Sequence, residues 1–209
     1  IAAENAYADA ILAPTRQLRD GLSAELTARL KPDDASVPVK DGEWWYSVRY
    51  RPGSEYPIAM RRRGVNGTDE VVLDVNLEAD GHAYYNVGDY DISPDDALLA
   101  FSEDTVSRRQ YTIRFRDLAT GDGLPDRIAG VDPAIVWADT GTTILYIEQD
   151  PETLLGVRVR AHTLGTDPTA DPVIFENDDD AYYMDIRVGR SKRHLFIDLE
   201  STDTTETLM

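Results

Sequence analysis

The chain has 209 residues, of which 42% are hydrophobic and 29% charged, and this balance is typical of a globular protein of ordinary domain size. No apolar run approaches the roughly 18 residues of a membrane-spanning helix. The chain has no cysteine and three widely separated histidines, so no disulfide, metal site or cofactor is expected. A net charge of −18 argues against nucleic acid as a partner, because phosphates need a basic surface.

Residues 1–31 have a helical pattern. Alanines dominate the first dozen positions and favour helix, and Pro14 then interrupts the pattern. In the second helix, leucines recur every four residues and form a one-sided apolar stripe at Leu18, Leu22, Leu26 and Leu30. We therefore expect an N-terminal helical segment at 1–36.

From about Val37 the apolar runs become short, aromatic and β-branched, with Gly, Pro, Asp and Asn between them. This pattern predicts many antiparallel strands with no helix among them. The expected fold class is therefore all-β after a helical lead-in. The candidate strands are 44–50, 56–62, 70–75, 83–87, 98–102, 110–118, 126–129, 134–137, 143–148, 155–163, 172–176, 182–187, 194–199 and 204–208.

The strand pattern repeats. Phe101, Tyr146 and Phe196 are spaced by 45 and 50 residues, and each follows a turn and an apolar residue or pair. A second series places Leu118 and Leu164 46 residues apart, each closing a strand at a turn. A period of about 40–50 residues with four short strands is typical of a β-propeller blade. A β-sandwich with coincidental spacing is the alternative.

The blades are expected at about 38–76, 83–130 and 134–177, and a fourth begins at 182. Residues 37–209 would then form a partial β-propeller of about three blades plus the start of a fourth. Propellers typically need four to eight blades to close. We therefore expect the chain to be a fragment whose end falls inside a blade.

The sequence predicts no catalytic residue. The string nearest to a nucleophile elbow, 189–193 (GRSKR), lacks the final glycine and falls in a strand-to-strand turn. The acidic run 176–180 lacks the alternation of a calcium loop, and we interpret it as a solvated loop between blades. Arg61, Arg62 and Arg63 are expected to pair with carboxylates or to cap a sheet edge rather than to bind phosphate.

Several strings resemble the oligopeptidase B (protease II) family of serine peptidases, and the match follows the whole chain in order. The string 162–166 (HTLGT) resembles the wider prolyl oligopeptidase family. Ser107 departs from the pattern, since glycine is expected there, and this should alter one hairpin only. The strings that carry the resemblance are 31–38 (KPDDASVP), 42–46 (GEWWY), 55–57 (EYP), 73–76 (LDVN), 81–82 (GH), 93–95 (SPD), 111–115 (YTIRF) and 117–121 (DLATG).

The resemblance implies a two-part enzyme. A seven-bladed propeller would cover a C-terminal α/β-hydrolase domain with a Ser–Asp–His triad, which cleaves short basic peptides after Arg or Lys in the cytoplasm. No triad position has a counterpart here, so the chain alone should be inactive. The helices at 1–31 resemble the segment that packs on the hydrolase domain in this family.

Two surfaces are expected to be adhesive in the isolated chain. The leucine stripe would lack its hydrolase partner, and the edge at 204–208 would lack a neighbouring strand. Self-association of the fragment is therefore expected. An alternative to the peptidase hypothesis is a stand-alone β-propeller that binds peptide or protein partners, and a reading frame with a downstream G-x-S-x-G motif would distinguish the two.

Overall fold

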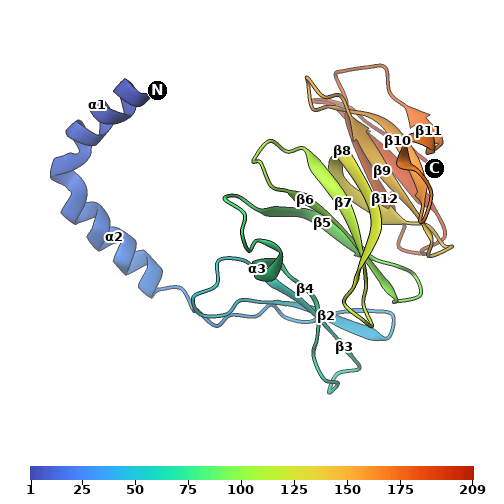
Figure 1. Cartoon of the computed structure of the whole chain (residues 1–209), viewed down its shortest axis with the longest axis horizontal. Helices are drawn as coiled ribbons and strands as arrows, with labels where there is room; N and C mark the ends of the chain where they lie inside the picture. Colours follow the sequence, from blue (N-terminus) through green and yellow to red (C-terminus); the bar gives the residue numbers. More distant parts are fainter. The chain divides into compact units, whose positions relative to one another are not determined.

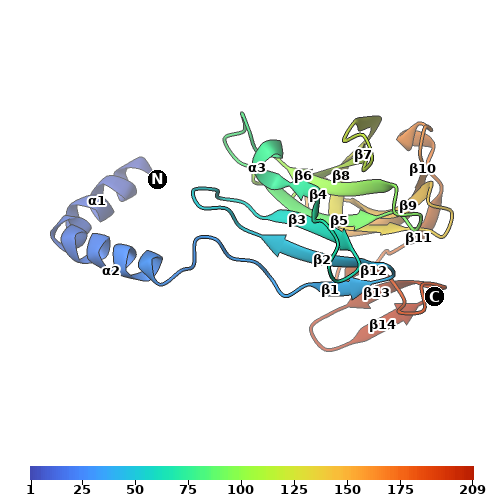
Figure 2. The ribbon, with the colours of Figure 1, turned by 90° about the horizontal axis from the view of Figure 1, so that it is seen from below.

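A computed structural model describes residues 1–209 and consists mainly of antiparallel strands (Figures 1 and 2). Contacts divide the chain into two compact units, residues 1–74 and residues 75–209. Each unit is described by itself below.

The first unit begins with helices, as predicted. They are α1 (Ala2–Leu12), the 3₁₀ turn η1 (Ala13–Thr15) and α2 (Arg16–Ala28). Pro14 lies in the first turn of η1, where its missing N–H costs no hydrogen bond. Neither α-helix buries a residue, and the four leucines of the stripe are all exposed. None of the helices is both long enough and apolar enough to traverse a lipid bilayer.

The same unit contains one four-stranded meander. Its strands are β1 (Val39–Asp41), β2 (Trp44–Arg49), β3 (Ile58–Arg63) and β4 (Glu70–Asp74), paired in sequence order. Trp44 is buried, and the guanidinium of Arg61 lies 4.1 Å from the centre of its ring. Arg61 pairs with Glu70 and Arg62 with Asp69, so the predicted pairing of this basic cluster is confirmed for both arginines.

The second unit begins with the short helix α3 (Val75–Glu78) and contains a seven-stranded antiparallel sheet. The sheet runs in the order β11-β10-β9-β8-β7-β6-β5. Its strands are β5 (Asn86–Ile92), β6 (Leu98–Asp104), β7 (Tyr111–Asp117), β8 (Gly123–Trp137), β9 (Thr143–Gln149), β10 (Gly156–Thr163) and β11 (Val173–Glu176), with the 3₁₀ turn η2 (Pro168–Ala170) before the last strand.

The seven strands are two blades that share β8. Up to Val131 this strand pairs with β7, and from Val131 onward it pairs with β9. The first part is antiparallel to β7 and therefore to β5. The second part runs in the same direction as β5. The N–H of Ile135 donates to Asp89 and the N–H of Trp137 donates to Asp91, so the residue numbers increase together along both segments. The chain therefore reverses its direction near Gly130, which has a φ of 73°.

A third sheet starts a further blade with β12 (Tyr183–Val188), β13 (Leu195–Glu200) and β14 (Thr205–Leu208). Its apolar residues Met184, Ile186 and Leu199 pack in one core with Ile147 and Val159 of the preceding blade. The predicted architecture, N-terminal helices followed by four-stranded antiparallel blades, is therefore confirmed.

The predicted repeat is correct for two of its three aromatic residues. In the second unit, the first hairpin of each blade closes with the same hydrogen bond, between 93 and 98, 138 and 143, and 189 and 194. Counting from these turns, Phe101 and Tyr146 are equivalent, but the equivalent residue in the last blade is Ile197. Phe196 lies one position earlier and so points to the opposite face, where it stacks under Arg187.

Some predicted strand boundaries were wrong. The expected strand 83–87 is observed as β5, which ends at Ile92, because its polar sequence gave a weak apolar signal. The expected strands 126–129 and 134–137 are parts of β8. The short elements β1 and α3 were missed, since three or four residues carry too little periodicity.

Candidate functional site

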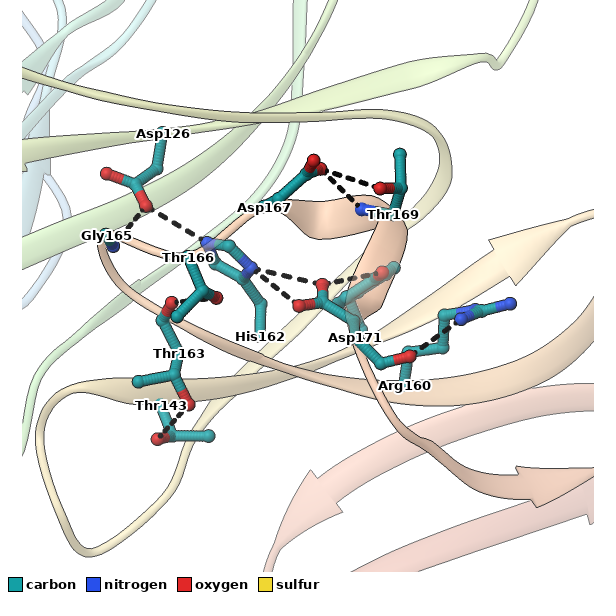
Figure 3. Close-up of polar contacts among 11 residues, drawn as sticks. Asp126, Thr143, Arg160, His162, Thr163, Gly165, Thr166, Asp167, Thr169 and Asp171 are labelled. Carbon is teal, nitrogen blue, oxygen red and sulfur yellow. Dashed lines mark hydrogen bonds and ion pairs between the residues drawn. The ribbon is translucent and has the colours of Figure 1, made fainter.

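A fully buried histidine is the centre of the strongest polar cluster in the second unit (Figure 3). His162 lies near the end of β10 and is 0% exposed. Its Nδ1 atom is 3.0 and 3.1 Å from the two carboxylate oxygens of Asp171, and its Nε2 atom is 3.1 Å from Oδ1 of Asp126. Both aspartates are also buried. Each ring nitrogen therefore has a carboxylate partner.

The cluster needs one proton more than a neutral imidazole and two ionised carboxylates contain, because a neutral imidazole has only one N–H donor. An ionised carboxylate only accepts hydrogen bonds, so both nitrogens of His162 must donate if both aspartates are charged. The alternative arrangement places that proton on one aspartate. Tyr146 donates from its hydroxyl to Oδ2 of Asp171 at 3.0 Å. Burial, followed by the charge of Asp171, raises the pKa of Tyr146 far above its usual range, so this hydroxyl remains a donor.

These contacts connect distant segments of the chain. Asp126 is on the part of β8 that belongs to the earlier blade, and it also accepts the N–H of Gly165 at 2.5 Å. Asp171 is in the connection between β10 and β11, and its carbonyl accepts from Nη1 of Arg160 at 2.8 Å. His162 therefore fastens two blades and one connecting loop together.

A shallow pocket of about 460 Å³ lies next to this cluster. Its size is within the usual range for small-ligand sites. Two arginines and two carboxylates balance its charge, and Tyr146 and Arg160 belong both to the pocket and to the cluster. Its lining consists of Arg127, Ile128, Ala129, Tyr146, Glu148, Arg160, Asp167, Pro168 and Thr169.

The geometry supports a positioning role rather than catalysis for His162. A ring with no exposed surface cannot exchange a proton with a substrate, and both nitrogens are already bonded. At the pocket surface, the hydroxyl of Thr169 donates to Asp167 at 2.8 Å. The backbone and side-chain hydrogen bonds from Thr169 lower the pKa of Asp167, so this carboxylate is a weak base for activating a nucleophile. The cluster holds Asp171, the loop beside Thr169 and Arg160 in place.

The earlier blade has a related network around Glu103. Its Oε2 atom accepts from the hydroxyl of Tyr85 at 2.7 Å and from Nη1 of Arg114 at 3.0 Å. Burial, followed by the hydrogen bond to Glu103, raises the pKa of Tyr85 far above its usual range. Glu148 and Arg160 form the equivalent pair in the next blade, at 2.6 Å. The repeat therefore includes an internal Glu–Arg pair as well as the aromatic position.

The motifs examined in the sequence are in ordinary structural settings. Ser191 lies in the hairpin turn between β12 and β13, not at a strand-to-helix elbow. The acidic run at 176–180 covers the end of β11 and the connection to β12. Sequence reasoning missed His162 as a cluster centre. Its nearest signal was Asp171, nine residues away, whereas Asp126 is 36 residues away.

The blades described above, each an antiparallel meander of short strands, are typical of β-propeller proteins. Residues 1–209 match the family model described as prolyl oligopeptidase, N-terminal β-propeller domain. The chain therefore belongs to the prolyl oligopeptidase family, and the matching part is its N-terminal propeller.

Similar proteins agree with this assignment. Dipeptidyl aminopeptidase BI of Pseudoxanthomonas mexicana is 46% identical over 98% of this chain and 30% of its own length. Protease 2 of Moraxella lacunata is 30% identical over 99% of this chain and 31% of its own length. The structure of oligopeptidase B from Leishmania major superposes with a TM-score of 0.90 at 29% identity, over 95% of this chain and 28% of that one. The chain thus spans about a third of the length of these relatives.

Proposed function

We propose that the chain is the N-terminal propeller portion of an oligopeptidase B-like serine endopeptidase that hydrolyses short peptides after Arg or Lys. The observation that carries the proposal is the family match over residues 1–209, together with the similarity to proteins named Protease 2 and oligopeptidase B. The catalytic triad would belong to a C-terminal α/β-hydrolase domain, which is the main partner of this chain. On the family resemblance we place the enzyme in the cytoplasm.

In this proposal the chain contributes access and docking rather than chemistry. The blades would restrict entry to short basic peptides. The segment 1–36 would be a separate docking element, because the exposed leucines of α2 offer an apolar surface to the hydrolase domain. The His162 cluster would keep neighbouring blades in register while the enzyme works.

A second activity is favoured by one observation. The relative with 46% identity is named a dipeptidyl aminopeptidase, which indicates release of dipeptides from a free N-terminus. The two activities differ in whether the substrate's α-amine must be free. A stand-alone binding module is a third candidate, and a reading frame that ends near residue 209 would favour it.

Two chromogenic substrates distinguish these activities in the full-length protein. An N-blocked Arg p-nitroanilide tests the endopeptidase, and a dipeptide p-nitroanilide ending in Arg with a free α-amine tests the dipeptidyl aminopeptidase. We expect hydrolysis of the blocked substrate and its loss when the serine of the downstream G-x-S-x-G motif is replaced by alanine. Hydrolysis of the free-amine substrate alone would favour the second activity, and hydrolysis of neither would contradict both.

A further inference from the structure

The loop between β6 and β7 has an unusual conformation. Ser107 and Arg109 both have a positive φ, 60° and 55°. Side chains other than glycine adopt this conformation at a cost of roughly 1 kcal/mol or more each. The buried carboxylate of Asp104 compensates, because it accepts the backbone N–H groups of Val106, Ser107, Arg108 and Arg109 at 2.8 to 3.0 Å. The hydrogen bonds to Asp104 therefore hold the loop in this conformation.

This fixed loop presents two cations to solvent. Arg108 and Arg109 are exposed, and neither guanidinium forms an ion pair or a side-chain hydrogen bond. Other arginines of the second unit that lie on strands, such as Arg114, Arg158 and Arg187, are paired with carboxylates. In a chain with net charge −18, these two arginines are therefore available to a partner of opposite charge.

The strand order places this loop on a definite face of the second unit. In each meander the first strand begins at one end of the blade, which is one face of the propeller. The turn between the first and second strands lies at the opposite end, and the second strand runs back to the first end. The loop between the second and third strands therefore lies on the same face as the connections between blades. We call this the entry face, and it carries the loops 105–110, 150–155 and 177–182.

Arg108 and Arg109 are the only cations in the entry-face loops of the second unit. The loop 150–155 contains Asp150 and Glu152, and the connection 177–182 contains three aspartates. A blade of four strands begins and ends at its entry face, so a domain that follows the propeller in the chain is joined to it there. Among these three loops, an acidic group on that domain would be attracted only to the loop with these two arginines.

We infer that Arg108 and Arg109 form a docking point for an acidic segment of the catalytic domain of the same protein. This inference rests on the proposed function, because it requires a domain that follows the propeller. The contact is electrostatic and local, since the neighbouring loops are acidic and repel the same segment elsewhere. It fixes the orientation of the catalytic domain over one blade.

Photo-crosslinking in the full-length protein tests the contact without using activity. The photoreactive residue p-benzoylphenylalanine replaces Val106, which is exposed in the same loop. The matched site is Asp139, in a turn of the opposite face. We expect the probe at 106, but not the probe at 139, to crosslink to an acidic peptide of the catalytic domain.

Charge reversal then tests the arginines themselves. Arg108→Glu with Arg109→Glu should lower the crosslink yield about tenfold, equivalent to about 1.4 kcal/mol. The control, Arg190→Glu with Arg193→Glu, changes the net charge equally on the opposite face and should leave the yield unchanged. If the reversed variant fails to fold by circular dichroism, Arg108→Gln with Arg109→Gln replaces it, and a smaller loss is expected.

The outcomes are separable. The absence of a crosslink, a crosslink confined to the propeller, or an unchanged yield in both arginine variants would overturn the docking point. A crosslink to the catalytic domain in a protein without peptidase activity would support the docking point and contradict the proposed function.

Discussion

His162 and Arg116 occupy the same position in successive blades, yet they bind different partners: Arg116 binds a helix residue, and His162 binds two buried aspartates. Each lies two residues after the arginine that pairs with the blade's internal glutamate, and their cross-strand partners Ile144 and Leu99 are also equivalent. Arg116 extends to Glu78 of α3 at 2.5 Å. His162 stays buried between two aspartates. The same backbone position thus supports an ion pair with α3 in one blade and a link between two blades in the next.

The first prediction concerns His162→Gln. A glutamine amide cannot donate in both directions, so at least one buried aspartate would lose the hydrogen bond from residue 162 and keep only its bond from Tyr146 or Gly165. Removing one partner of a buried charged pair typically costs about 3 to 5 kcal/mol. We expect a fall in unfolding free energy near the lower end of this range, measured by urea denaturation. His82→Gln is the control, because His82 is exposed and the change should stay within about 0.5 kcal/mol. Equal midpoints for both variants would contradict the structural role of His162.

The second prediction concerns Ser107→Gly. Glycine adopts a positive φ without steric cost, whereas Ser107 has a φ of 60°. We expect the free energy of unfolding to rise by about 0.5 kcal/mol, since glycine's greater freedom in the unfolded chain offsets part of the gain. Ser191→Gly is the control, because Ser191 has no positive φ and should lose stability. Thermal denaturation distinguishes the two changes, and a loss in both would show that Ser107 is unstrained.

The third prediction concerns pH. Burial, followed by repulsion from Asp185, raises the pKa of Asp132. The unfolded chain therefore ionises this group at lower pH than the folded chain, and stability falls as pH rises through the raised folded pKa. Asp132→Asn should raise the unfolding free energy at pH 7 by less than about 1 kcal/mol after solvent screening, and the gain should vanish below about pH 4. The exposed Asp139→Asn serves as the control, and a gain for Asp132→Asn that does not depend on pH would contradict the ionisation argument.

The fourth prediction concerns self-association of residues 1–209. Leu18, Leu22 and Leu26 are between 49% and 64% exposed on one side of α2. Burying roughly 400 Å² of such surface would contribute about 10 kcal/mol before the cost of association. We expect dimers or larger species by light scattering, with more association at high salt because the like charges are screened. Leu22→Glu should restore the monomer, whereas Ala24→Glu, on the opposite side of the helix, should not. A monomeric parent chain would contradict the prediction.

Periodicity predicted the blades because each strand buries an apolar stretch of similar length after a similar turn. The turns share a backbone conformation, with positive φ at Asp96, Gly141 and Lys192. Since three different residues adopt it, the sequence could not have marked this position. Phe196 misled the register, because an aromatic side chain can cover either face of a strand. The His162 cluster could not be predicted, since it depends on Asp126, which only the packing of two blades brings near.

The shared strand β8 has a consequence for how the molecule can change over evolution. No loop separates the two blades that it joins, so an inserted segment there would break hydrogen bonds to β7 or β9. The next joint, at 177–182, is an exposed connection between separate sheets. Insertions, deletions and exchange of whole blades among homologues should therefore accumulate at the second joint, while the two blades joined by β8 are inherited as one module.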